Sequence, residues 1–288
     1  MAMLVDRFGE DGERGRELET MAAGLKAVGT WHATATIQDC REACGGQGYL
    51  RANRFAALKA DTDVFTTFEG DNTVLLQLVA KNLLTGFKHD YADMNVLGTA
   101  AFFAGQLFET VAERSALREL IGRLGDDLIP GRDDEADLLD REAQLDTARW
   151  REEHLLAGLA RRLRGGMDDD DTDPFELLIA CQDHLVLAAR AYVDRIVLEA
   201  FAEAVERAPE GERELLGRLC DLHALSLFER ERAFFQEHGR FSSTRSKAVI
   251  KCVSATCAEL APHARLLVDA FGIPEPCLAS ARTIAGGV

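Results

Sequence analysis

The sequence predicts an all-α protein made of two helical-bundle domains. Apolar residues recur at helical spacing through most of the chain, and no segment shows the alternating pattern of a strand. Polar turns rich in Gly, Pro and Asp separate the periodic segments. One of these turns, residues 122–137, contains all three residue types, and we place a domain boundary inside it, which gives domains 1–133 and 134–288.

The first domain is predicted to begin with a long helix over residues 13–44, which ends at Gly45. A shorter amphipathic segment, 53–66, follows the glycine turn, and its apolar side chains are expected to form a buried face: Phe55, Leu58, Phe65 and Phe68. Asp71 and Asn72 can cap the next helix, whose apolar residues follow at once up to Leu84. We expect a connection at 88–95 and another helix at 96–121.

The second domain is predicted to contain four long antiparallel helices, as an up-and-down bundle requires. Asp173 and Pro174 have the residue types that start a helix, and Ser242 or Ser243 can cap the last one. Pro262 is expected to kink that last helix. The four predicted helices cover residues 138–163, 174–207, 210–238 and 242–271.

Composition excludes several classes of function. With 49 acidic and 33 basic residues the net charge is −16, which argues against nucleic acid and anionic membranes as partners. No apolar run is long enough to span a membrane, the first residues do not resemble a signal peptide, and the last residues are not a Ser-Lys-Leu peroxisomal address. We therefore expect a soluble cytoplasmic protein. The seven scattered cysteines are expected to be reduced and mostly buried, with no metal site.

One stretch has residues suited to chemistry. Gly45, Gly46 and Gly48 allow positive φ and a close approach of the backbone to a ligand. Glu69 stands just before a predicted helix N-terminus, at the edge of the core. Taken alone, Glu69 is typical of a capping or solvated carboxylate, and the glycines are typical of a helix stop.

These residues also resemble a known family. The segments Arg-Glu-Ala-Cys-Gly-Gly-Gln-Gly-Tyr at 41–49 and Phe-Glu-Gly-Asp-Asn-Thr-Val at 68–74 are similar, in identity and separation, to the flavin-site segment of the acyl-CoA oxidases. The related dehydrogenases usually place Thr two residues after the glutamate, where this chain has Asp71. The resemblance extends over nearly the whole chain and also implies helical C-terminal domains.

The resemblance implies roles for particular residues. Glu69 would be the base that removes the α-proton of a fatty acyl-CoA while the β-hydride passes to flavin N5. The glycine turn would approach the nucleotide of a flavin bound mainly by a neighbouring subunit. The implied FAD contacts are Gly45, Gly46, Gly48, Asp71 and Asn72, and the implied substrate contacts are Phe68 and Gly70.

Members of the family carry an N-terminal helical domain and a β-domain ahead of this region, so the resemblance implies a partner that supplies them, in a homo- or hetero-oligomer. An enzyme that forms trans-2-enoyl-CoA and hydrogen peroxide is therefore expected, inactive without its N-terminal half. Three alternatives stay open: a catalytically silent assembly subunit, a dehydrogenase-type enzyme with another electron acceptor, and an unrelated helical interaction protein.

Overall fold

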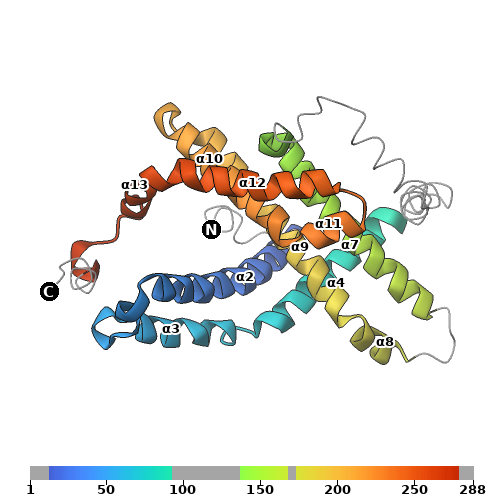
Figure 1. The fold of residues 1–288 in the computed structure, drawn as a ribbon. Helices are drawn as coiled ribbons and strands as arrows, with labels where there is room; N and C mark the ends of the chain where they lie inside the picture. The colour runs from blue at the N-terminus through green and yellow to red at the C-terminus, as the bar shows by residue number, and fades with distance from the viewer. Residues whose placement is uncertain (1–12, 93–136, 168–172, 279–288) are drawn as a thin grey trace. The chain divides into compact units, whose positions relative to one another are not determined.

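The computed structural model describes residues 13–92, 137–167 and 173–278 (Figure 1). Every regular element in these residues is an α-helix or a 3₁₀-helix, which confirms the all-α prediction. None of the described helices is long and apolar enough to cross a membrane. The chain groups into two compact units: unit 1 holds Met1–Leu84, Leu155–Val193 and Arg265–Val288, and unit 2 holds Thr85–His154 and Asp194–Ala264.

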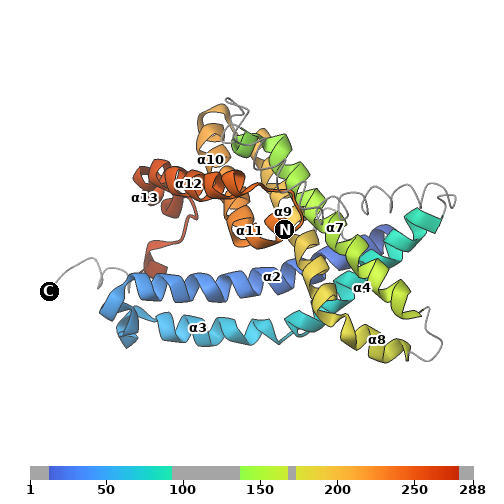
Figure 2. The ribbon, with the colours of Figure 1, turned by 45° about the vertical axis from the view of Figure 1, so that its right-hand side comes forward.

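Unit 1 is organised around the long helix α2, Glu13–Ala43. The shorter α3, Phe55–Asp63, lies beside α2 in both views (Figures 1 and 2), and the Thr34 hydroxyl donates a hydrogen bond to Asp63 at 3.2 Å. The other elements that lie wholly or partly in unit 1 are η1 Gly45–Tyr49, η2 Arg51–Asn53, η3 Val64–Thr66, α4 Asn72–Ala92, α7 Arg141–Met167, α8 Pro174–Ala180, α9 Gln182–Arg207, α13 Ala264–Asp269 and η6 Glu275–Leu278.

The core of unit 1 is made by one side of α2 together with α4, α7 and α9. Gly24 allows α2 to approach α9 closely, since a Cβ on this glycine would stand 2.5 Å from Cγ2 of Val193. Apolar side chains from all four helices are buried: Met21, Ala27, Leu76, Val79, Ala157, Leu159, Leu185, Ala188 and Val193. This burial supplies the hydrophobic stabilisation of the unit and fixes the N-terminal end of α4 against α2.

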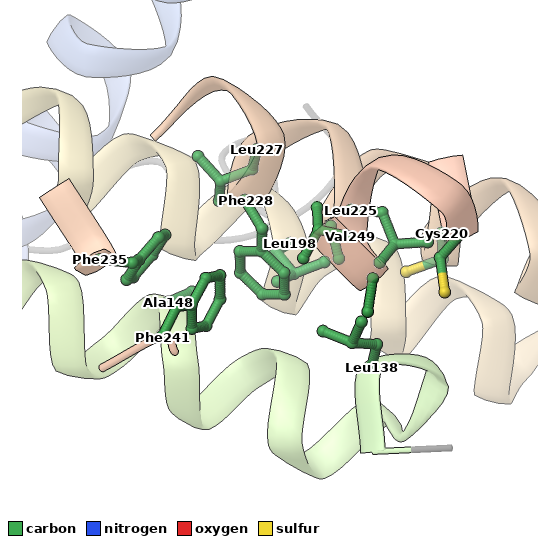
Figure 3. Close-up of a cluster of buried hydrophobic side chains, with 13 residues drawn as sticks. Leu138, Ala148, Leu198, Cys220, Leu225, Leu227, Phe228, Phe235, Phe241 and Val249 are labelled. Atoms are coloured by element: carbon green, nitrogen blue, oxygen red, sulfur yellow. The ribbon is translucent and has the colours of Figure 1, made fainter. Parts of the chain in front are cut away.

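Unit 2 has an aromatic core (Figure 3). It is built from parts of α7 and α9 together with η4 Asp137–Leu139, α10 Glu210–Arg230, α11 Arg232–Glu237 and α12 Ser243–Leu260. The rings of Phe235 and Phe241 stack with centroids 4.5 Å apart, and Phe228 meets both edge-on at 5.7 and 5.9 Å. Helices α10 and α12 pack against each other around these rings.

Ion pairs also join the helices of unit 2. The buried guanidinium of Arg151 contacts Asp194 at 2.9 Å and Glu231 at 3.1 Å. Arg195 pairs with Glu152 and, at 2.6 Å, with Glu199. Burial raises the pKa of Glu152, although the hydrogen bond and charge of Arg195 oppose that rise. These charged groups are placed between α7, α9 and α10, so the register of the three helices is set by polar contacts as well as by the core.

Local sequence signals placed most helix ends correctly. Pro174 begins α8, the Ser242 hydroxyl accepts from the Arg245 amide at 3.0 Å at the start of α12, and a 3₁₀ turn, Ala261–His263, forms around Pro262. Other expectations were wrong. α4 continues to Ala92 instead of ending before a connection at 88–95, because no residue in that segment breaks the helical pattern.

Three further helices differ in detail. Residues 174–207 are two helices with a turn at Cys181, residues 210–238 are interrupted at Glu231, and α7 continues through Gly165 and Gly166 to Met167. The expected helix at 96–121 and the boundary at 133/134 lie outside the described residues, so the two domains stay a prediction. All seven cysteines are free thiols, but only Cys181, Cys220 and Cys252 are buried, fewer than expected.

Candidate active site

The glycine turn follows the C-terminus of α2. Gly45 takes a φ of 55°, a left-handed conformation that ends the helix at little cost for glycine. The turn then continues as η1, and the Asn53 side chain closes it by donating to the Gln47 carbonyl at 2.7 Å. The guanidinium of Arg41 lies 4.2 Å from the centre of the Tyr49 ring. The backbone of Gly45 and Gly46 is left exposed, with no atom within 4 Å of where either Cβ would stand.

The three glycines therefore do different things, although each of them could adopt positive φ, as the sequence allows. Among them only Gly45 does so. Gly48 is buried, and a Cβ there would lie 2.8 Å from the carbonyl carbon of Arg41, so its close approach is to its own chain. Gly46 has no positive φ, and no described atom lies within 4 Å of its Cβ position, so its backbone is open to solvent in this structure.

Glu69 occupies an unusual backbone position. Its φ is 60°, and Gly70 follows with a φ of 101°. Residues other than glycine rarely adopt positive φ, because their Cβ then crowds the backbone. Residues that are held in this conformation are concentrated at functional sites. The Glu69 side chain is exposed, and so is the neighbouring Phe68, at 64%.

The turn that carries Glu69 leads directly into α4. The carboxylate of Asp71 accepts from the amides of Thr73 at 2.9 Å and Val74 at 3.4 Å, so it caps the helix as its residue type predicted. Gly70 packs near Leu75, since a Cβ on it would lie 3.0 Å from a Leu75 methyl carbon. Glu69 is thus held two residues ahead of the cap, on the outside of the helix N-terminus.

Asn72 lies under this turn and is 1% exposed. Its amide nitrogen donates to the Ala27 carbonyl at 3.1 Å and to the Thr30 hydroxyl at 2.9 Å, both on α2. The ammonium of Lys26 donates to the Asn72 side-chain oxygen at 2.9 Å and to the Gly70 carbonyl at 2.6 Å. Asn72 therefore joins α4 to α2. Its side chain is buried, whereas the side chain of Glu69 is exposed.

Sequence reasoning missed Lys26 and Thr30. Both lie on α2, more than forty positions before the turn that they hold. A signal was available: Lys26 stands between Leu25 and Val28 in the apolar stripe of the helix, where a charged side chain needs a polar partner.

The expected buried face of residues 53–66 is not buried, and this prediction was wrong. Phe65 is 51% exposed, and the segment leading into α4 also presents large apolar side chains to solvent. We call the exposed apolar residues within five positions of Glu69 the Phe68 surface; its members are Val64, Phe65, Phe68 and Val74. The amphipathic pattern correctly marked apolar residues, but it does not reveal which part of a protein covers them.

The structure does not bring Glu69 and the glycine turn into one cluster. The Glu69 turn is tied to α2 at Lys26, whereas the glycine turn begins after Ala43 at the end of the same helix. At 1.5 Å per residue these two points are roughly 25 Å apart along the helix. The two turns therefore lie at separate places along α2.

Comparison with known proteins places these features in a family. A model described as acyl-CoA oxidase, C-alpha1 domain, matches residues 4–84, and a model described as acyl-CoA oxidase matches residues 140–283. The chain is 30% identical to acyl-coenzyme A oxidase 2, peroxisomal, of Arabidopsis thaliana, and 32% identical to peroxisomal acyl-coenzyme A oxidase 3 of Homo sapiens. Each alignment covers 94% of this chain, but only 38% and 37% of those relatives.

Solved structures share the fold. Acyl-CoA oxidase-1 of Caenorhabditis elegans, complexed with FAD and ATP, superposes with a TM-score of 0.75 at 20% identity, over 95% of this chain and 39% of that one. A tomato acyl-CoA oxidase gives a TM-score of 0.75 at 23% identity, with the same coverage. The acyl-CoA oxidase model alone matches half of the chain, and a second model from the same family matches the segment with both turns. The chain therefore belongs to the acyl-CoA oxidase family, and it spans well under half the length of the curated relatives that it matches.

Proposed function

We propose that this chain is the C-terminal part of a flavin-dependent acyl-CoA oxidase, with Glu69 as the catalytic base. In the reaction a fatty acyl-CoA loses its α-proton to the Glu69 carboxylate and its β-hydrogen as hydride, which gives a trans-2-enoyl-CoA. FAD, when bound, would supply the hydride acceptor, and its reoxidation by oxygen, which takes two electrons and two protons, would give hydrogen peroxide. The observation that carries the proposal is the left-handed φ of 60° at Glu69.

The position of Glu69 suits proton abstraction. An α-proton of a thioester is weakly acidic, so a base must be held close to it and kept from bulk water. The left-handed backbone costs free energy, and such strain is tolerated where a side chain must point in one direction. The hydrogen bonds of Asp71 to the start of α4 and of Asn72 to α2 hold the turn in place. The exposed Glu69 carboxylate is therefore attached to a rigid element.

The Phe68 surface supports the proposal that another polypeptide completes the site. Phe68 and Phe65 are exposed beside the proposed base, and an acyl chain or an apolar protein surface would cover them. We propose that an N-terminal acyl-CoA oxidase half or subunit does so and encloses the fatty acyl-CoA against Phe68 and Gly70. Exclusion of water by that partner would also strengthen the electrostatics of proton transfer.

FAD is proposed to meet this chain at the glycine turn. Gly45 and Gly46 fit a close approach of the nucleotide, because no atom lies within 4 Å of either Cβ position. Gly48, Asp71 and Asn72 already make contacts inside the chain, and we propose that they serve FAD by shaping the two turns. The roughly 25 Å between the turns along α2 agrees with a flavin nucleotide at the glycine turn that belongs to a neighbouring subunit's site.

The decisive experiment replaces the proposed base. Glu69→Gln keeps the shape of the side chain but cannot accept a proton. In a complex of this chain with an N-terminal acyl-CoA oxidase half, we expect anaerobic mixing with acyl-CoA to leave the flavin oxidised, while acyl-CoA still binds. Glu19→Gln, at an exposed position on α2 outside both turns, is the matched control and should reduce flavin at the wild-type rate.

Normal flavin bleaching in Glu69→Gln would exclude this residue as the base. It would favour the assembly-subunit alternative, for which the Phe68 surface gives independent support. If the complex bleaches normally but consumes no oxygen, the electron acceptor is another protein, as in a dehydrogenase. A cytoplasmic location remains a proposal from the sequence, whereas both curated relatives described above are named as peroxisomal; fractionation of native cells would decide it.

A further inference from the structure

The turn that carries Glu69 is held by one cation. The Lys26 ammonium donates to the carbonyl of Gly70 at 2.6 Å, and Gly70 is the residue directly after Glu69. A second hydrogen bond, at 2.9 Å, joins the same ammonium to the side-chain oxygen of Asn72. One side chain on α2 therefore contacts the turn and the first residue of α4 together.

The two acceptors are well suited to a charged donor. The first carbonyl used inside α4 belongs to Asp71, which accepts from the Leu75 amide at 2.9 Å, so the Gly70 carbonyl lies outside the helical ladder. Hydrogen bonds from an ammonium are stronger than those between neutral groups; the bond to Asn72 is partly buried, whereas the bond to the Gly70 carbonyl is exposed. Lys26 thus satisfies a carbonyl that the helix does not use.

The backbone at this point needs such support. Glu69 and Gly70 are consecutive residues with positive φ, at 60° and 101°. A glutamate in this conformation is strained, and it stays there only when surrounding contacts fix it. The Lys26 bond to the Gly70 carbonyl fixes the peptide that follows Gly70, because a rotation of Glu69 or Gly70 back to negative φ would move that carbonyl away from the ammonium.

Asn72 makes the arrangement stiff. Its amide nitrogen is occupied by the Ala27 carbonyl and the Thr30 hydroxyl, so its oxygen is oriented toward Lys26. The Lys26 ammonium therefore has a fixed position, and the carbonyl it binds has one too. We call Lys26, Thr30 and Asn72 the α2 clamp.

We infer that Lys26 is a positioning residue for the catalytic carboxylate: through the Gly70 carbonyl and Asn72 it holds Glu69 in the direction in which it meets the substrate. The inference rests on the proposed function of Glu69. Lys26 acts through the turn and is not assigned any contact with the substrate. A misplaced base loses rate steeply, since proton transfer needs its donor and acceptor at hydrogen-bonding distance.

The first test measures the turn itself, in the full chain and without substrate. Lys26→Met keeps the length of the stem and removes the donors. We expect hydrogen exchange in a peptide covering residues 66–75 to become about tenfold faster, because the loss of a charged hydrogen bond lowers the opening free energy of the turn. Lys59→Met is the matched control, since Lys59 makes an ion pair with Asp63 in the neighbouring α3. Equal exchange in the two variants would overturn the inference.

The second test measures flavin reduction in a complex with an N-terminal acyl-CoA oxidase half. Lys26→Met should lower the rate of flavin reduction about tenfold or more while acyl-CoA affinity changes little. Lys26→Arg keeps the charge and has N–H donors for both hydrogen bonds, so it should recover part of the rate. A loosened turn with a wild-type reduction rate in Lys26→Met would overturn the positioning role. Normal reduction in Glu69→Gln is a separate result: it removes the proposed base and leaves the exchange measurement standing as a finding on the turn.

Discussion

Gly48 lies directly against the backbone of Arg41, so that a Cβ on the glycine would stand 2.8 Å from the Arg41 carbonyl carbon and closer still to its oxygen. No flexible side chain is involved, and the strain of a substitution would have to be relieved by moving the end of α2. Gly46, two positions earlier, faces open space. The glycine turn therefore contains one residue fixed by the fold and one that the fold leaves unconstrained.

Gly48→Ala is expected to destabilise the chain. The added methyl group overlaps main-chain atoms, and overpacking of this kind lowers the free energy of unfolding by about 1–3 kcal/mol. Gly46→Ala, whose Cβ meets no atom within 4 Å, is the control and should change stability little. Urea denaturation followed by circular dichroism measures both. A Gly48→Ala chain as stable as the control would mean that the turn relaxes freely.

Gly46→Val is expected to separate FAD retention from folding. In a complex with an N-terminal acyl-CoA oxidase half, the Cβ and two methyl groups would occupy space that a nucleotide uses for close approach to the backbone. We expect less FAD bound per complex, at a melting temperature near that of the wild type. Flavin absorbance after gel filtration, together with a thermal melt, gives both quantities. Full FAD occupancy in the variant would place the nucleotide elsewhere.

The sequence was most informative where structure is decided locally. The caps at Asp71 and Ser242 depend on amides two or three residues away, so residue type and position predicted them. The α2 clamp depends on residues 46 positions apart, which no local pattern joins. The Phe68 surface shows a third case, because periodicity identified an apolar face without identifying what covers it.

Glu152 gives unit 2 a pH-dependent contribution. Burial raises its pKa above the ordinary value of 4.5, so the folded state binds its proton more tightly than the unfolded state does. Its contribution to the unfolding free energy is therefore fully present below about pH 4.5 and is lost as the pH rises through the folded pKa. We expect the stability of the wild type minus that of Glu152→Gln to fall as the pH increases from that value.

Urea titrations of both chains at a series of pH values would measure this slope. Glu142→Gln removes a carboxyl from an exposed position on α7 that is not among the groups shifting the pKa of Glu152, so it shows the effect of the charge change alone. A stability difference between wild type and Glu152→Gln that rises with pH would reverse the sign and would mean that Arg195 outweighs burial at this carboxyl.

The Phe68 surface predicts how the chain behaves without a partner. We expect the purified chain to be strongly helical and to form dimers or larger species, because exposed large apolar side chains self-associate when nothing covers them. It should carry no flavin and show no oxidase activity on acyl-CoA. Circular dichroism, light scattering and an absorbance scan measure these properties, and a yellow preparation that forms peroxide unaided would contradict the need for an N-terminal half.

The surface responsible can be identified by substitution. Replacing Phe65 and Phe68 by serine removes two large rings from the Phe68 surface, and the mass measured by light scattering should then shift toward that of a single chain. Phe271, which is 80% exposed beyond α13, offers a matched control on another segment, because its replacement removes an even more exposed ring. Association is driven by the apolar area that becomes buried, so a shift with Phe271→Ser, and none with the double variant, would assign self-association to the C-terminal segment and not to the surface beside Glu69.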